Sequence, residues 1–106
     1  MNFLFVCSKN QWRSPTAERI FKHGYGISTR SAGTSQNARH TVTSDDIAWA
    51  DKIFVMEYKH QKQLKQSFAD LLDDKALIVL DILDDYGYMD DELVELITLS
   101  LTPYLP

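Results

Sequence analysis

Disulfide bonds within the chain are excluded, because its 106 residues include only one cysteine, Cys7. A chain without a disulfide framework has no need of an oxidising compartment. The sequence also lacks a basic segment followed by a long apolar core at its start, and no apolar run approaches the ~20 residues of a membrane-spanning helix. We therefore expect a cytoplasmic protein that does not act in a membrane.

An excess of positive charge is missing as well. The formal net charge of −4, from 11 Lys and Arg against 15 Asp and Glu, argues against general binding of nucleic acid. The histidines His23, His40 and His60 lie in separate segments and have no second cysteine to join, so neither a metal site nor another cofactor is expected. The length predicts a single domain over residues 1–106, without repeats or linkers.

Apolar runs of strand length alternate with helical patterns along the chain. This alternation predicts an α/β fold built from βαβ units around a parallel sheet. Strands are predicted at residues 3–7, 27–31, 52–56 and 76–80. One helix is predicted to begin at Ser14-Pro15, and three others are predicted to cover residues 44–49, 58–68 and 90–101. Loops are predicted at residues 34–43 and 81–89.

Cys7 is predicted to lie at the carboxyl end of the first strand, the edge where open parallel sheets bind ligands. The segment from Ser8 to Arg13 then leads into the amino end of a helix, whose free N–H groups and dipole attract an anion. A cysteine beside such a site, with Lys9 and Arg13 nearby, favours the thiolate form. The fork of an arginine matches two oxygens of a phosphate. A thiolate nucleophile, an anion site and an arginine together predict phosphoryl transfer to sulfur.

The alternative interpretation of Cys7 and Arg13 is purely structural. Most free cysteines act as small buried hydrophobic residues, and a spacing of two residue types recurs by chance. However, a cation at the amino end of a helix opposes the helix dipole, so Arg13 is electrostatically unfavourable there unless an anion lies beside it. The position of Arg13 therefore favours the functional interpretation.

Residues 4 to 18, LFVCSKNQWRSPTAE, resemble the phosphate-binding loop of the low-molecular-weight protein tyrosine phosphatase family, whose pattern is Cys-x5-Arg-Ser-Pro followed by Ala-Glu. The segments RSAGT (30–34), ADKIFVME (50–57) and LDDY (83–86) are similar, in the same order, to the second strand, the third strand and the acid loop of that family. The resemblance implies a three-layer, flavodoxin-like α/β fold. Its four-stranded parallel sheet would have the order 2-1-3-4, with helices on both faces.

The resemblance also implies a role for each residue of the loop. Cys7 would be the nucleophile, Arg13 would bind the phosphate, and Asp84 would be the general acid. Asn10 would hold a left-handed turn, a conformation that asparagine tolerates, and Ser14 would donate a hydrogen bond to the thiolate. The other residues expected to bind substrate are Ser8, Lys9, Gln11, Trp12 and, as an aromatic wall of the pocket, Tyr86.

Three residues depart from the family pattern. Lys9 replaces the usual loop glycine, Trp12 stands where many members have a second cysteine, and Asp85 replaces the proline after the acid. Without a second cysteine, the protective disulfide of the nucleophile cannot form. The chain is also shorter than a usual member by roughly a third, with the missing residues after Gly33, and so resembles a shortened member of the family.

We therefore expect a cysteine-dependent phosphomonoester hydrolase that acts on phosphotyrosine in proteins or on another aryl phosphate. One alternative is arsenate reduction with an external thiol, because arsenate mimics phosphate and one cysteine cannot relay electrons within the chain. The other is a phospho-binding module, if Lys9 and the shortened chain impair turnover. The sequence identifies neither the physiological substrate nor the oligomeric state, and it leaves open whether Asp84 or Asp85 is the acid.

Overall fold

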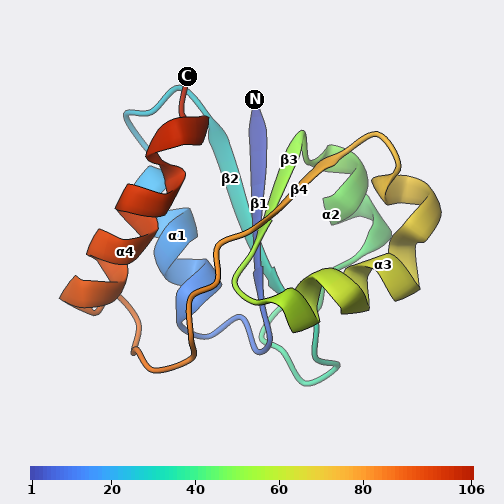
Figure 1. Ribbon diagram of the computed structural model, residues 1–106, viewed down its shortest axis with the longest axis horizontal. Helices are drawn as coiled ribbons and strands as arrows, with labels where there is room; N and C mark the ends of the chain where they lie inside the picture. Colours follow the sequence, from blue (N-terminus) through green and yellow to red (C-terminus); the bar gives the residue numbers. More distant parts are fainter.

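A four-stranded parallel sheet in the order β2-β1-β3-β4 forms the centre of the computed structural model, which describes residues 1–106. The strands are β1 (Asn2–Cys7), β2 (Ser28–Gly33), β3 (Lys52–Val55) and β4 (Ala76–Val79). Every neighbouring pair is parallel, so the carboxyl ends of all four strands meet at one edge, the lower edge in Figure 1. The predicted strand order is confirmed.

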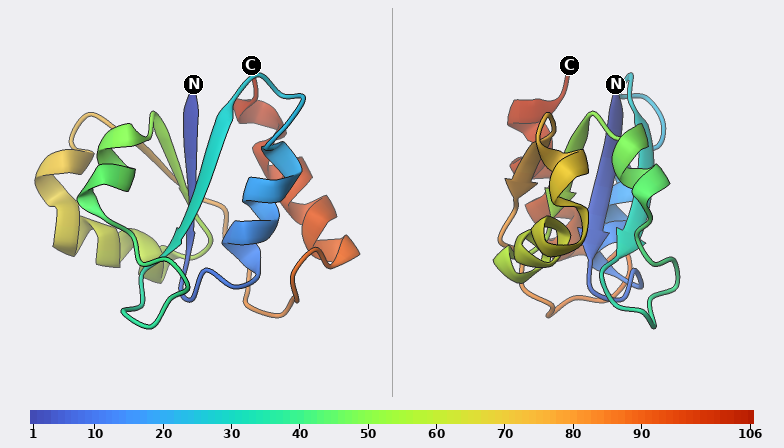
Figure 2. Two further views of the ribbon diagram at one scale, coloured as in Figure 1. Left: turned by 180° about the vertical axis from the view of Figure 1, so that it is seen from behind. Right: turned by 90° about the vertical axis from the view of Figure 1, so that its right-hand side faces the viewer.

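Helices cover both faces of this sheet, so the predicted three-layer architecture is also confirmed (Figure 2). α1 (Arg13–Phe21) and α4 (Asp91–Leu101) lie side by side on one face, and α2 (Ser44–Trp49) and α3 (Tyr58–Leu72) lie on the other. A short 3-10 helix, η1 (Thr102–Tyr104), follows α4. No helix combines the length and the apolar composition that crossing a membrane requires.

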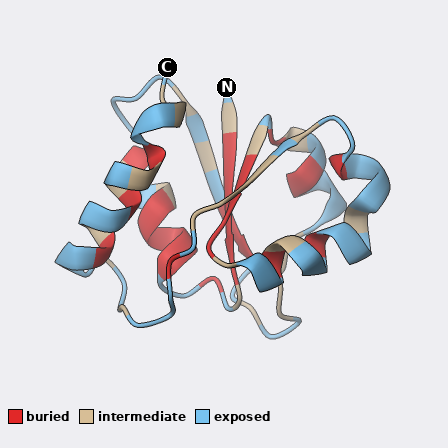
Figure 3. Ribbon diagram, in the orientation of Figure 1, coloured by how far each residue is buried: buried red, intermediate tan, exposed pale blue.

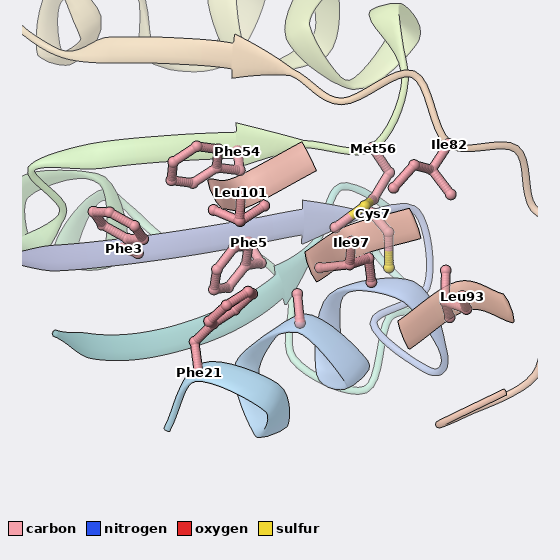
Figure 4. Packing of buried hydrophobic residues seen from close by; sticks show 11 residues of the cluster. Phe3, Phe5, Cys7, Phe21, Phe54, Met56, Ile82, Leu93, Ile97 and Leu101 are labelled. Carbon is pink, nitrogen blue, oxygen red and sulfur yellow. The ribbon is translucent and has the colours of Figure 1, made fainter. Parts of the chain in front are cut away.

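β1 is the most buried element of the fold (Figure 3). Because alternate side chains of a strand point to opposite faces, Phe3, Phe5 and Cys7 join a cluster of 11 buried residues under α1 and α4, whereas Leu4 and Val6 join a second cluster under α2 and α3. Figure 4 shows that Cys7 lies beyond the phenylalanine rings of the first cluster, near Met56 and Ile97. The buried strand therefore leads straight to the carboxyl edge of the sheet.

Some element boundaries differ from the predictions. α1 begins at Arg13 and has no side-chain cap, so the predicted capping role of Ser14 is wrong. The cap of α2 is Thr43, which forms a capping box with Asp46. α3 continues to Leu72, past its predicted end at Phe68, where the backbone leaves helical geometry (φ −134°, ψ 27°) and the helix kinks. β2 covers Ser28–Gly33 instead of residues 27–31.

Candidate active site

The loop of residues 8–12 connects β1 to α1 at the carboxyl edge of the sheet, and Cys7 and Arg13 flank it. Cys7 is the last residue of β1 and is 3% exposed, whereas Arg13 is the first residue of α1 and is 2% exposed. A buried arginine at the start of a helix needs partners that compensate for its charge. Those partners come from distant parts of the chain.

The sulfur of Cys7 lies 2.9 Å from Ser14 Oγ. The Ser14 hydroxyl accepts a hydrogen bond of 2.9 Å from Asn10 Nδ2, and its own proton has two acceptors within reach, Cys7 Sγ at 2.9 Å and the carbonyl oxygen of Ala32 at 3.3 Å. Asn10 also donates to Ser31 Oγ at 2.9 Å, and its φ of 56° places it in the left-handed region. The predicted turn at Asn10 is therefore present, and the asparagine fixes the hydroxyl that contacts the thiol.

Two hydrogen bonds from one terminal nitrogen, Nη1, hold the guanidinium of Arg13 in place. Its Nη1 donates to Glu57 Oε2 at 2.6 Å and to the carbonyl oxygen of Ile82 at 2.8 Å, while Nε lies 3.6 Å from Asp84 Oδ1. The edge formed by Nε and Nη2 donates no hydrogen bond to the protein. Two parallel N–H groups of the fork are thus left to bind an oxyanion.

Glu57 is the anion that compensates for Arg13 in this structure. Burial alone would raise the pKa of Glu57, but the hydrogen bond and the charge of Arg13 outweigh it and hold that pKa below its ordinary value. Glu57 is also the N-cap of α3, and it forms a capping box with His60. Glu57 therefore both caps α3 and holds the arginine of the loop.

His60 is fully buried and connects α3 to the loop. Its Nδ1 accepts from the backbone N–H of Glu57 at 3.1 Å, so Nε2 carries the proton and donates to Ser8 Oγ at 2.8 Å. Burial, together with the charge of Arg13, lowers the pKa of His60 to about 4. The imidazole is therefore neutral at pH 7, and the proton of the Ser8 hydroxyl is free to be donated elsewhere.

The loop packs tightly against the segment after β2. Backbone N–H groups of Thr34 and Ser35 donate to the carbonyl oxygens of Cys7 and Ser8 at 2.9 and 3.0 Å. A Cβ on Gly33 would lie only 2.5 Å from the Ser8 carbonyl oxygen, so this close approach requires glycine. The segment RSAGT (30–34) therefore packs against the loop that follows Cys7.

Lys9, Gln11 and Trp12 are the exposed residues of the loop. Lys9 does not have a positive φ, so the replacement of glycine there places no strain on the backbone. Trp12 is 46% exposed, and the chain has no second cysteine that could form a disulfide with Cys7. The departures at positions 9 and 12 thus alter the rim of the site without distorting the loop.

The segment after β4 reaches over the same edge of the sheet. Asp84 is half exposed and lies beside Arg13, as the 3.6 Å separation from Nε shows. Tyr86 is half-buried against the core cluster that contains Cys7, and its hydroxyl lies 3.5 Å from Glu92 Oε1. Partial burial and then the Glu92 carboxylate raise the pKa of Tyr86. The acid loop expected from LDDY therefore lies against the arginine of the first loop.

Sequence reasoning missed two of the contacts that hold this site together. His60 was considered only as a metal ligand, and no group of three or more histidine, cysteine or carboxylate side chains is arranged to hold a metal ion. The carbonyl of Ile82 carries no sequence signal, because any residue supplies one. The position of Glu57 at the end of a strand was a usable signal, since the carboxyl ends of parallel strands share one edge.

A family model described as low molecular weight phosphotyrosine protein phosphatase matches residues 2–81 of the chain. The search of curated protein sequences found no match to the chain. Solved structures give a similar result for the fold. A mutant of the YwlE arginine phosphatase with a phosphorylated active-site serine has a TM-score of 0.76 at 24% identity, covering 94% of this chain and 93% of that one.

Two other solved bacterial phosphatases have a similar fold. SP-PTP, a low molecular weight protein tyrosine phosphatase from Streptococcus pyogenes, has a TM-score of 0.77 at 20% identity and covers 97% of this chain and 89% of its own. The YwlE arginine phosphatase from Geobacillus stearothermophilus has a TM-score of 0.73 at 23% identity, with coverages of 97% and 92%. These structures share the fold of the chain along nearly its whole length.

Proposed function

Since the chain belongs to the low molecular weight phosphotyrosine protein phosphatase family, whose members are cysteine-dependent phosphatases, we propose that it hydrolyses aryl phosphates through a phosphocysteine at Cys7. Phosphotyrosine in a protein is the substrate class that this proposal favours. The observation that supports it best is the contact of 2.9 Å between Cys7 Sγ and Ser14 Oγ, in a loop that ends at a buried arginine. A hydroxyl that donates to sulfur stabilises a thiolate, which is the nucleophilic form.

In the first step, the thiolate of Cys7 attacks phosphorus and the bond from phosphorus to the leaving phenolic oxygen breaks. The Nε and Nη2 edge of Arg13 binds two of the phosphoryl oxygens, while Nη1 stays anchored to Glu57 and Ile82. The backbone of residues Ser8 to Trp12 surrounds the anion, with the side chains of Lys9, Gln11 and Trp12 at the rim. Because the arginine is anchored in advance, little reorganisation is needed when the phosphate arrives.

We assign the general acid to Asp84, which lies beside Arg13, whereas Asp85 has no such contact. Asp84 gives its proton to the leaving oxygen. In the second step its carboxylate takes a proton from the water that attacks phosphocysteine, which releases inorganic phosphate and restores the thiolate. Tyr86, in the same loop, would form the aromatic wall of the pocket.

The lone reduced thiol required by this chemistry is stable in the reducing cytoplasm, and we place the enzyme there. The test is a steady-state assay with p-nitrophenyl phosphate and a panel of phosphopeptides, comparing the parent protein with Cys7→Ser. We expect turnover by the parent and none by the variant, with phosphate binding retained. Phosphoarginine and arsenate with glutathione belong in the panel, because a preference for either one would overturn the assignment to aryl phosphates.

A further inference from the structure

A hollow of about 680 Å³ runs along α1 beside the Cys7–Arg13 loop. We call it the basic groove. Its lining includes Arg19 and Lys22 from α1 and the end of that helix, Arg39 from the loop after β2, and Tyr88 from the loop before α4. Gln11 of the catalytic loop also lines it, so the groove and the proposed phosphate site share one rim.

The charge of the groove is opposite to that of the protein. Three cations, Arg19, Lys22 and Arg39, line it in a chain whose net charge is −4, and none of the three forms a salt bridge. The one acidic residue in the lining, Glu18, already accepts a hydrogen bond from the Ser31 hydroxyl. The three cations therefore outnumber the single carboxylate of the lining, which forms no salt bridge with any of them.

The helix dipole explains only part of this arrangement. Arg19 and Lys22 stand at the carboxyl end of α1, where cations are favourable. Arg39 belongs to another segment, and its Nε donates to the carbonyl oxygen of Asn10 at 3.0 Å. Arg19 Nη1 in turn lies 3.4 Å from the hydroxyl of Tyr88. Cations from two separate segments thus converge on one hollow, and hydrogen bonds to the catalytic loop and to Tyr88 hold two of them there.

The opposite side of the site is acidic. The exposed carboxylates Asp84 and Asp85 lie there, in the segment after β4, whereas Glu57 on the same side is paired with Arg13 and Lys59. A peptide whose phosphorylated side chain enters the loop must lay its flanking residues over the surfaces on either side. Acidic flanking residues are repelled by one side and attracted by the groove.

We propose that the basic groove binds acidic residues adjacent to the phosphorylated residue of a protein substrate. This inference rests on the proposed function, and it narrows the substrate class to phosphoproteins with an acidic segment on one side of the phosphotyrosine. The groove is large enough for a short peptide segment. Small aryl phosphates do not reach it.

The test compares phosphotyrosine peptides of equal length whose flank is acidic on the amino side, acidic on the carboxyl side, or uncharged. The variant is Arg19→Gln with Lys22→Gln, because both residues are exposed and glutamine keeps the helix propensity. Lys62→Gln with Lys65→Gln on α3, on the far side of the sheet, is the matched control. We expect kcat/KM of the parent for one acidic peptide to fall about 5–10-fold in the groove variant, mostly through KM, and to be unchanged in the control.

Turnover of p-nitrophenyl phosphate should be the same in all three proteins, because this substrate does not reach the groove. High salt should weaken the acidic preference of the parent by screening the exposed charges. Equal kcat/KM for acidic and uncharged peptides, or an acidic preference that survives in the groove variant, would overturn the proposal.

A second measurement separates this proposal from the chemistry on which it rests. Fluorescence anisotropy of an unphosphorylated acidic peptide with Cys7→Ser reports the groove without turnover. If Arg19→Gln with Lys22→Gln abolishes this binding and the parent protein hydrolyses no aryl phosphate, the groove is supported and the phosphatase assignment is refuted. Hydrolysis without any acidic preference would do the reverse.

Discussion

His60 should make the folded protein lose stability as the pH falls below neutrality. The imidazole is buried, accepts from the Glu57 N–H and donates to Ser8, and its pKa is lowered from 6.5 to about 4. In the unfolded chain it binds a proton near pH 6.5, so between pH 6.5 and 4 the unfolded state binds more protons than the folded state. The free energy of unfolding therefore decreases as the pH falls through that window.

The magnitude follows from the size of the shift. A pKa that moves from 6.5 to about 4 corresponds to a total of about 3 kcal/mol, of which about 2 kcal/mol is already lost at pH 5. Asp46 and Glu57 contribute little in this range. Their pKa values are lowered by hydrogen bonds from His40 and Arg13 that outweigh burial, so the stability that they supply is lost only below about pH 4.5.

The perturbation that isolates the effect is His60→Gln, because glutamine does not titrate and is a common residue at this position of a capping box. Urea unfolding of parent and variant, followed by tryptophan fluorescence at pH 7.5, 6, 5 and 4.5, gives the difference in free energy at each pH. All other titratable groups are common to both proteins and cancel in that difference. We expect the parent to lose about 2 kcal/mol relative to the variant between pH 7.5 and 5. A difference that does not change with pH would show that His60 is not held neutral.

Four further outcomes follow from the site. Arg13→Lys keeps the charge but loses the fork, so kcat for p-nitrophenyl phosphate should fall on the order of 10²-fold, and an unchanged kcat would remove Arg13 from the phosphate site. Asp84→Asn should slow substrates with poor leaving groups on the order of 10²-fold while Asp85→Asn does not, and a reversal in a leaving-group series would move the acid to Asp85. Peroxide should convert Cys7 to sulfinic and sulfonic acids that dithiothreitol does not restore, as intact mass and residual activity would show, whereas a Trp12→Cys variant should recover. Gly33→Ala should lower stability by roughly 1–3 kcal/mol and reduce kcat, because its Cβ would meet the Ser8 carbonyl, while Gly87→Ala, which has open space around it, should leave melting temperature and kcat unchanged.

The sequence was sufficient to predict the architecture, because the local pattern of apolar and polar residues indicates most of the strands and helices. The apolar run of β1, the alternation with helical patterns and the Cys-x5-Arg-Ser-Pro motif predicted the layers and the position of the loop. Boundaries were less accurate where local preference loses to tertiary contacts. Serine is a common N-cap residue, but the hydroxyl of Ser14 contacts Cys7 instead of capping the helix.

The contacts that complete the site were harder to predict, since they join residues far apart in sequence. Arg13 and Ile82 are separated by 69 positions, and Ser8 and His60 by 52. Nothing in the sequence around His60 distinguishes a buried, neutral imidazole from a solvent-exposed one. Its role depends on which residues the fold brings against it.

The anchoring of Arg13 by the carbonyl of Ile82 has a consequence for the order in which the enzyme is made. The catalytic loop is synthesised well before residue 82, yet the carbonyl that orients its arginine follows β4, the third strand to be added after β1. A nascent chain that ends before residue 82 holds Cys7, Arg13 and Glu57 without the Ile82 carbonyl or the proposed acid, Asp84. We therefore expect catalytic competence only after β4 and the segment that follows it have been synthesised, although the motif with Cys7 and Arg13 is translated earlier.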